Sequence, residues 1–205
     1  LKLNVITFKF DNPEGIIINL HGLGSHFQNF YDSGNNLNNR IKLFNEIKLI
    51  TYALEFRGHG KSEGIRCSIN DFDDLVKDLD CLIHYIKDLY KELPIYILAE
   101  SMGCAVCIKY AIANPNILQG VILLSPMCGL DSSLKPSFLV KQILFCISRC
   151  FPNYKLFPSS GSSGTGCNNE TYLKAKFDCC YNYNDKLRLC TARECYLASE
   201  WIKTN

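Results

Sequence analysis

Two hydrophobic periods alternate along residues 5–124, and they predict strands alternating with helices. Short, nearly continuous apolar runs are typical of strands buried on both faces. The predicted strands are Val5–Phe10, Ile16–Leu20, Lys48–Leu54, Ile95–Leu98 and Val121–Leu124. Apolar residues at helical spacing predict helices over Leu37–Phe44, Asn70–Tyr90 and Met102–Ala113. This order predicts an α/β domain with a mostly parallel sheet and flanking helices.

The alternation stops after Pro126. The pattern predicts one mostly apolar helix over Pro136–Cys150 and short helical pieces within Thr171–Lys203. Between them, residues 157–166 are rich in Pro, Ser and Gly, which indicates a flexible segment. We therefore expect residues 1–127 to form the α/β core and residues 128–205 to form a helical cap or lid.

The composition of the chain mainly excludes classes of protein and kinds of site. The 205 residues fit one domain, and a net charge of +2 without a basic stripe gives no nucleic-acid signal. No apolar run reaches the length of about 18 residues that spans a bilayer. Several of the 12 cysteines fall on core-like positions, which favours a reducing compartment over a disulfide framework. These are Cys81, Cys104, Cys107 and Cys146. The other cysteine spacings match no zinc pattern, so we expect no metal and no cofactor.

The strand over Ile95–Leu98 runs directly into a turn and a helix, with Ser101 at the turn. Ala99 and Gly103, two positions before and after it, are small where strand and helix nearly touch. This layout is typical of a nucleophile elbow, which presents a serine hydroxyl at the edge of a sheet. The N-terminal N–H groups of the helix can bind a developing oxyanion. The alternative is a serine that only caps the helix.

Two glycine-rich turns precede this serine. The turn His21-Gly22-Leu23-Gly24 follows a buried strand and can face a backbone N–H towards a nucleophile. We assign one oxyanion donor to Leu23 and a second to Met102. The loop Arg57-Gly58-His59-Gly60 follows the next strand and needs positive φ at its glycines. We interpret His21 and His59 as residues that brace these turns.

Together with Leu123-Leu124-Ser125-Pro126, these motifs resemble the α/β-hydrolase superfamily over about residues 5–130. The most similar branch contains the monoacylglycerol lipases and lysophospholipases, beside the serine-aminopeptidase-like hydrolases. The resemblance implies that Ser101 is a nucleophile and that the substrate is an ester. Two positions depart from the family pattern, because Ala99 replaces the first glycine of the elbow and Glu55 replaces an aspartate.

In this fold the catalytic acid and histidine follow the serine in chain order. All four histidines of this chain precede Ser101; they are His21, His26, His59 and His84. We therefore expect a chain truncated before the acid, the histidine and the last strands of the fold. Such a chain would be nearly inactive by itself.

The sequence thus predicts part of a serine hydrolase that cleaves a lysophospholipid or a monoacylglycerol through an acyl-enzyme on Ser101. The predicted cap helix would supply an acyl pocket from Phe138, Leu139, Ile143, Leu144 and Ile147. The cap would also contact a membrane surface, with a cytoplasmic or peripheral location. Two alternatives stay open: a general carboxylesterase for small soluble esters, and a non-catalytic hydrolase-like protein that binds lipid or a partner.

Overall fold

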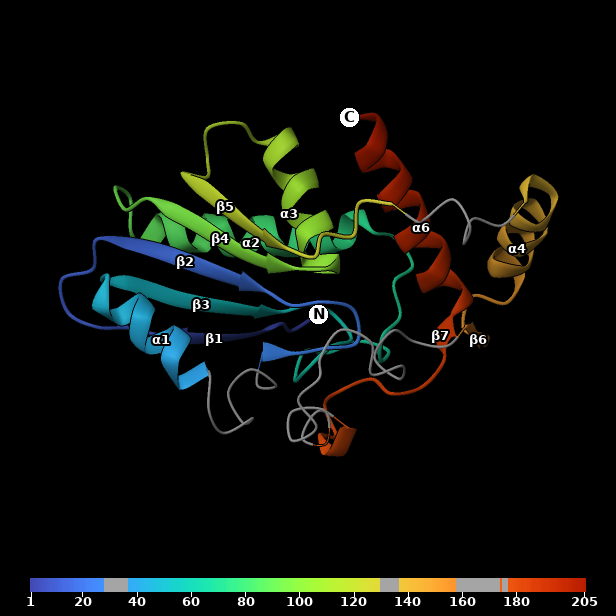
Figure 1. Ribbon diagram of the computed structural model, residues 1–205, viewed down its shortest axis with the longest axis horizontal. Coiled ribbons are helices and arrows are strands. Elements are labelled where there is room, and N and C mark those ends of the chain that lie inside the picture. The colour runs from blue at the N-terminus through green and yellow to red at the C-terminus, as the bar shows by residue number, and fades with distance from the viewer. Residues whose placement is uncertain (28–36, 130–136, 158–173, 175–176) are drawn as a thin grey trace.

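The computed structural model describes residues 1–27, 37–129, 137–157, 174 and 177–205. Its centre is a five-stranded sheet in the order β1-β3-β2-β4-β5 (Figure 1). The strands are β1 (Asn4–Phe8), β2 (Gly15–Leu20), β3 (Leu49–Glu55), β4 (Ile95–Glu100) and β5 (Gly120–Leu124). Neighbours among β2 to β5 are parallel, and β1 pairs with β3 in the antiparallel direction. The predicted mostly parallel sheet is confirmed.

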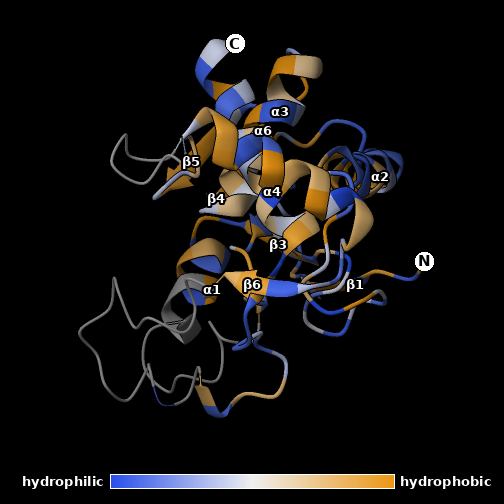
Figure 2. Cartoon of the chain, turned by 90° about the vertical axis from the view of Figure 1, so that its right-hand side faces the viewer, coloured by the Kyte–Doolittle hydropathy of each residue, from blue (hydrophilic) through white to orange (hydrophobic). Residues whose placement is uncertain are grey.

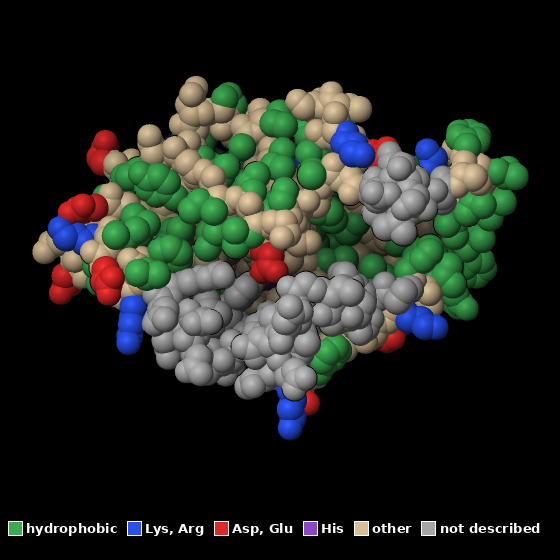
Figure 3. Space-filling view, in the orientation of Figure 1, with side chains coloured by type: hydrophobic (Ala, Val, Ile, Leu, Met, Phe, Trp, Pro, Cys, Tyr) green, Lys and Arg blue, Asp and Glu red, His purple; other side chains and the backbone are tan. Residues whose placement is uncertain are grey.

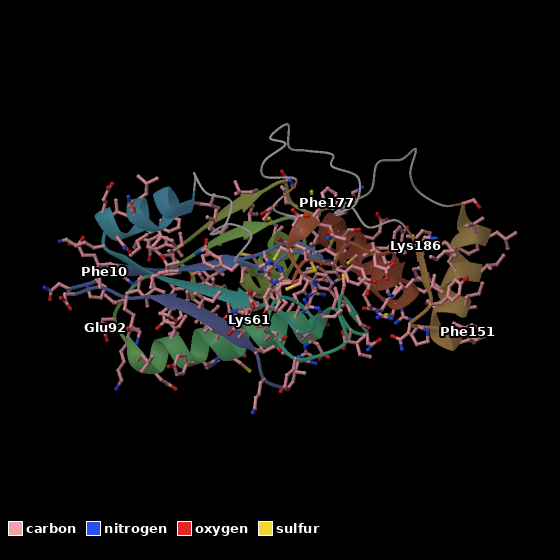
Figure 4. All side chains as sticks on the ribbon, turned by 90° about the horizontal axis from the view of Figure 1, so that it is seen from below. Phe10, Lys61, Glu92, Phe151, Phe177 and Lys186 are labelled. Carbon is pink, nitrogen blue, oxygen red and sulfur yellow. The ribbon has the colours of Figure 1, made fainter. Side chains whose placement is uncertain are left out.

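Helices cover both faces of this sheet. They are α1 (Leu37–Glu46), α2 (Asp73–Leu89) and α3 (Met102–Ala113). Figure 4, which views the molecule from below, shows α1 on one side of the sheet and α2 on the other. The strand side chains divide accordingly. Ile16 and Ile18 join the main core with α2 and α3, whereas Ala53 packs with Phe27 and Ile41 on the face that α1 covers.

The strand β5 lies at one edge of the described sheet and departs from its predicted burial. Its apolar run is typical of a strand buried on both faces. In the structure, Val121, Ile122 and Leu124 are 43%, 54% and 38% exposed. Their exposure follows from the strand order, because β5 pairs on one side only, with β4.

The chain after β5 forms a second layer at the end of the sheet. It contains α4 (Phe138–Cys150), β6 (Lys155–Phe157), β7 (Leu187–Arg188) and α6 (Leu189–Thr204). Here α6 contacts both α3 and α4, so it lies between the sheet layer and α4 (Figure 1). The expectation of short helical pieces was wrong for α6, which is one helix of 16 residues. The predicted flexible stretch after Phe157 lies outside the described residues.

Hydrogen bonds tie α6 to the loop that precedes α2. The Thr191 hydroxyl donates to the Cys67 carbonyl at 2.8 Å and accepts from the Ile69 N–H at 3.0 Å. The Phe72 N–H donates to the Glu194 carboxylate at 3.2 Å. Ala198 is 3% exposed and belongs to the main core cluster. This helix is therefore fixed to the loop before α2 and contributes to the main core.

The cysteines divide between core and surface. Cys104 and Cys107 are buried in α3, as predicted, and all described cysteines are free. The same expectation was wrong for Cys81 and Cys146, because α2 and α4 turn them towards solvent. Among the described helices, none combines the length and the hydropathy needed to cross a membrane.

Candidate active site

Ser101 occupies a strained turn between β4 and α3. Its φ of 50° and ψ of −110° are rare for a residue with a side chain. Three backbone hydrogen bonds hold this conformation. The Ser101 N–H donates to Leu124 O at 3.0 Å, and Ser101 O accepts from Cys104 N at 3.1 Å and Met127 N at 3.2 Å. The turn thus presents the hydroxyl at the carboxyl edge of the sheet.

Steric crowding explains why the residues two positions before and after Ser101 are small. A β-carbon on Gly103 would lie 2.7 Å from Leu20 O and 2.9 Å from His21 O, which are closer than real contacts allow. Ala99 is 1% exposed, so its methyl group fits at the first small position. The alanine therefore fills the place of the family's first glycine without displacing the turn.

The first glycine-rich turn passes directly beside the Ser101 side chain. A β-carbon on Gly22 would lie 3.3 Å from Ser101 Cβ. The turn is closed by the Ser25 N–H, which donates to Gly22 O at 3.2 Å. Leu23 follows Gly22 in this turn, and Met102 opens α3, where the first N–H groups have no acceptor within the helix. The structure thus brings both predicted donor residues to the segments that meet at Ser101.

His21 joins this turn to the end of β3. Its Nε2 accepts the Phe56 N–H at 3.1 Å, so the proton resides on Nδ1, which faces Gly22 O at 2.8 Å. Burial, reinforced by the neighbouring His59, lowers the pKa of His21 to about 3. Both nitrogens of this neutral imidazole contact the backbone, one in the first glycine-rich turn and one at the end of β3.

The second glycine-rich loop is clamped to α2. Arg57 donates from Nε and from a terminal nitrogen to the Asp78 carboxylate, at 2.8 Å and 2.6 Å. His59 Nδ1 lies 3.0 Å from Arg57 O, and burial lowers the pKa of His59 to about 4. Gly58 and Gly60 have φ values of 70° and 50°, as the sequence requires. These contacts hold the loop against α2.

Sequence reasoning missed the part played by Glu55. This carboxylate is 1% exposed and accepts hydrogen bonds from Asn4 Nδ2 and the Lys61 N–H, both at 2.7 Å. Burial alone would raise the pKa of Glu55, but contacts with His26, Lys61 and Asn4 outweigh it and lower the pKa to about 2. A β-carbon on Gly60 would clash with the same carboxylate. The sequence did contain a signal for this role, because Glu55 is a charged residue at the end of a buried strand.

An apolar cavity of about 380 Å³ opens between α4 and α6. It reaches Met127, whose N–H donates to the Ser101 carbonyl, so it lies near the turn that carries Ser101. Apart from Gly129, which lies in the connection after β5, the other lining residues come from both helices and both short strands. The lining residues besides Met127 are Gly129, Lys141, Leu144, Phe145, Phe157, Leu187, Ala192, Cys195, Tyr196 and Ser199.

The structure corrects most of the predicted pocket. Leu144 lines this cavity, but the other four predicted residues do not. Phe138, Leu139, Ile143 and Ile147 are 73%, 69%, 50% and 41% exposed. They form an apolar surface over α4, visible as the hydrophobic area at the right-hand end of Figure 3. Figure 2 shows hydrophobic colours along most of α4, so periodicity could not indicate which face turns inward.

Comparison with known proteins gives one family. The family model described as "Serine aminopeptidase, S33" matches residues 11–205. A monoglyceride lipase homolog of Monkeypox virus is 27% identical over 73% of this chain and 52% of that protein. The monoglyceride lipase of Rattus norvegicus is 30% identical over 56% of this chain and 36% of that protein. The chain thus spans about half, or less, of the length of these relatives.

Solved structures share the fold. The monoacylglycerol lipase of Paleococcus ferrophilus has a TM-score of 0.78 and 22% identity, covering 100% of this chain and 72% of that one. A soluble variant of the monoglyceride lipase of Saccharomyces cerevisiae, in complex with a substrate analog, has a TM-score of 0.74 and 15% identity. That match covers 99% of this chain and 66% of the yeast chain. The chain therefore has an α/β-hydrolase fold and belongs to the serine aminopeptidase (S33) family, on the branch that resembles monoacylglycerol lipases.

Proposed function

We propose that this chain carries the nucleophile, the oxyanion donors and the acyl site of a serine hydrolase for lipid monoesters. The strained Ser101 turn, with an apolar cavity beside it, is the observation that supports this function. A monoacylglycerol is the favoured substrate over a lysophospholipid, because relatives in several organisms are named monoglyceride lipases.

In the proposed reaction, Ser101 Oγ attacks the acyl carbonyl of the ester. The N–H groups of Leu23 and Met102 bind the oxyanion of the tetrahedral intermediate. The C–O bond to the glycerol then breaks, the glycerol leaves with a proton, and the acyl group stays on Ser101. A water molecule attacks this acyl-enzyme and releases the fatty acid.

The cavity supports an acyl chain rather than a small soluble ester. Its walls are mainly aliphatic and aromatic, with Leu144 and Phe145 on one side and Tyr196 on the other. Among the described residues that line it, Lys141 is the one lysine or arginine. We propose that α4, β6, β7 and α6, here called the cap segment, act as the lid of this acyl site.

We do not assign the general base for Ser101 to any of the four histidines, because the contacts that the structure gives them are to other groups. His21 is bonded to Gly22 O and the Phe56 N–H, His59 to Arg57 O, and His84 to Asp80 O. His26 Nε2 lies 3.2 Å from Cys179 Sγ. None of these partners is Ser101. We therefore propose that residues 1–205 alone hydrolyse esters slowly, because losing the base of a triad costs several orders of magnitude in rate.

A fluorophosphonate probe tests the nucleophile directly. In the protein expressed from its gene, we expect covalent labelling that Ser101→Ala abolishes. Ser125→Ala is the matched control, because Ser125 follows the neighbouring strand and also has a positive φ, of 47°. Labelling that survives Ser101→Ala, or that only Ser125→Ala removes, would assign the nucleophile to another serine.

The exposed apolar surface of α4 suits contact with the lipid phase that holds such substrates. Four residues form it: Phe138, Leu139, Ile143 and Ile147. We propose that this surface rests on membranes and makes the protein peripheral. In flotation with neutral phosphatidylcholine vesicles, Leu139→Glu should reduce binding severalfold. Leu43→Glu on α1, where Leu43 is 55% exposed, should leave binding unchanged; equal loss in both variants would count against the proposal.

A further inference from the structure

A second cluster of reactive side chains does not include Ser101. Cys179 Sγ is 3.2 Å from His26 Nε2, and His26 Nδ1 is 3.5 Å from Glu55 Oε1. The side chains of His26 and Glu55 are each 1% exposed, whereas Cys179 is partly exposed. A thiol, an imidazole and a carboxylate thus stand in line, with the thiol at the solvent end.

Three distant segments build this cluster. Glu55 ends β3, His26 follows the glycine-rich turn beside Ser101, and Cys179 lies two residues after Phe177, which is labelled in Figure 4. The Tyr181 ring meets the His26 ring edge-on, with centroids 5.7 Å apart. The Tyr183 N–H donates to Gly24 O at 2.8 Å. The segment carrying Cys179 is therefore docked on the turn that carries His26.

The carboxylate is held in place for its part in the cluster. Two donors, Asn4 Nδ2 and the Lys61 N–H, bind Glu55 Oε2, which leaves Oε1 facing the imidazole. Lys61 is labelled in Figure 4, and its ammonium lies 5.5 Å from the centroid of the Tyr181 ring. A carboxylate oxygen 3.5 Å from Nδ1 favours a proton on that nitrogen, so His26 Nε2 is the nitrogen that accepts the thiol proton.

We propose that Cys179 is an activated thiol and a covalent modification site for small α,β-unsaturated carbonyl compounds. The sulfur attacks the β-carbon of the acceptor while His26 Nε2 takes the thiol proton. The S–C bond forms, the C=C π bond breaks, and the proton returns from His26 to the α-carbon. The net reaction is an addition, so nothing leaves and no oxidant is needed.

The other described thiols give the contrast. Burial raises the pKa of Cys67 and of Cys107 to about 12, which keeps both as unreactive thiols. Cys180 and Cys81 are exposed, and neither has a histidine hydrogen bond within the described residues. Exposure alone therefore ranks Cys180 and Cys81 above Cys179, whereas general-base assistance ranks Cys179 first.

Acrylamide labelling near neutral pH separates these rankings. Peptide mass spectrometry would give the rate at each cysteine, with fragment ions separating Cys179 from Cys180. We expect Cys179 to react on the order of tenfold faster than Cys180 and Cys81, a modest part of what a general base supplies. His26→Gln should remove that advantage and leave Cys81 unchanged. Ser101→Ala should change neither rate, so the test is independent of the proposed hydrolase function.

Two results would overturn this assignment. One is a Cys179 rate in the unaltered protein that does not exceed that of Cys180. The other is an undiminished Cys179 rate in His26→Gln. Labelling of Cys107, which is fully buried, would reveal unfolding of that variant. In that case Glu55→Gln is used in place of His26→Gln. We expect this variant to label severalfold more slowly at Cys179, and an unchanged labelling rate would contradict the proposal.

Discussion

Gly22 abuts Ser101: a β-carbon on Gly22 would lie 3.3 Å from Ser101 Cβ and 3.9 Å from Ser101 Oγ. The backbone of the glycine-rich turn is thus packed against the Ser101 side chain. No larger residue fits there without moving either the turn or the serine by a few tenths of an ångström.

Gly22→Ala should therefore impair the site more than the fold. We expect fluorophosphonate labelling of Ser101 to slow by about tenfold or more, as for the loss of an oxyanion contact. The free energy of unfolding should change by no more than about 1 kcal/mol, because one methyl group needs only a small shift. Labelling at the unaltered rate would show that the turn does not touch the reacting groups.

Gly103→Ala should destabilise the fold itself. Its new methyl group would meet the carbonyl oxygens of Leu20 and His21, which are backbone atoms and cannot rotate away. Overpacking of this kind costs about 1–3 kcal/mol, measured by urea unfolding. Gly120→Ala is the control, because its methyl group would meet only the edge of the Tyr96 ring. Equal destabilisation by both changes would contradict the steric account.

Acid should destabilise the protein through its buried histidines. His21 and His59 have pKa values of about 3 and about 4 in the folded state, below their ordinary value of 6.5. As pH falls below 6.5, the unfolded chain binds protons that the folded chain refuses. The free energy of unfolding should then fall by about 1.4 kcal/mol per pH unit for each histidine. Glu55 acts in the same direction at lower pH, because its stabilisation is lost between 4.5 and about 2.

His59→Gln isolates one of these protons. Between about pH 6 and about pH 4, its unfolding free energy should depend on pH about half as steeply as that of the unaltered protein. Urea unfolding at a series of pH values measures both slopes. Parallel slopes would mean that His59 is not kept neutral by the fold.

Narrowing the cavity should discriminate between long and short substrates. Ala192→Phe places a ring in the space that we assign to the acyl chain. We expect hydrolysis of a long-chain monoacylglycerol to fall by about tenfold or more, while a short-chain ester is affected little. Leu139→Phe is the control, because Leu139 is 69% exposed and faces away from the cavity. A uniform loss for both substrates would place the acyl chain elsewhere.

The core and the serine turn could be predicted because their signals are local. The boundaries of α3 match the prediction, since Ser101 and Asn114-Pro115 mark its two ends in the sequence. Apolar runs such as Ile16–Leu20 predicted the strands. Each of these patterns depends on neighbours in the chain, which a sequence displays directly.

The cavity and α6 could not be predicted, because their signals are tertiary. The buried residues of α6 include Cys190, Thr191 and Ser199, so its inner face is small and partly polar and gives a weak helical period. On α4, apolar residues surround most of the helix, and only its packing against α6 decides that Leu144 faces inward. Likewise, nothing in the spacing indicates that His26 and Cys179, 153 residues apart, come into contact.

The attachment of α6 also sets an order of events during folding. Its hydrogen bonds to Ile69 and Phe72 join residues 122 positions apart in the chain. Closing so long a loop costs conformational entropy, and the free energy of the contacts offsets this cost only when they form together. The local β-α-β units around Ser101 can therefore assemble first. The apolar side chains that α6 covers in the folded protein are then still exposed to water. During synthesis this interval is the period of greatest aggregation risk, when a chaperone would find the most exposed apolar surface to bind.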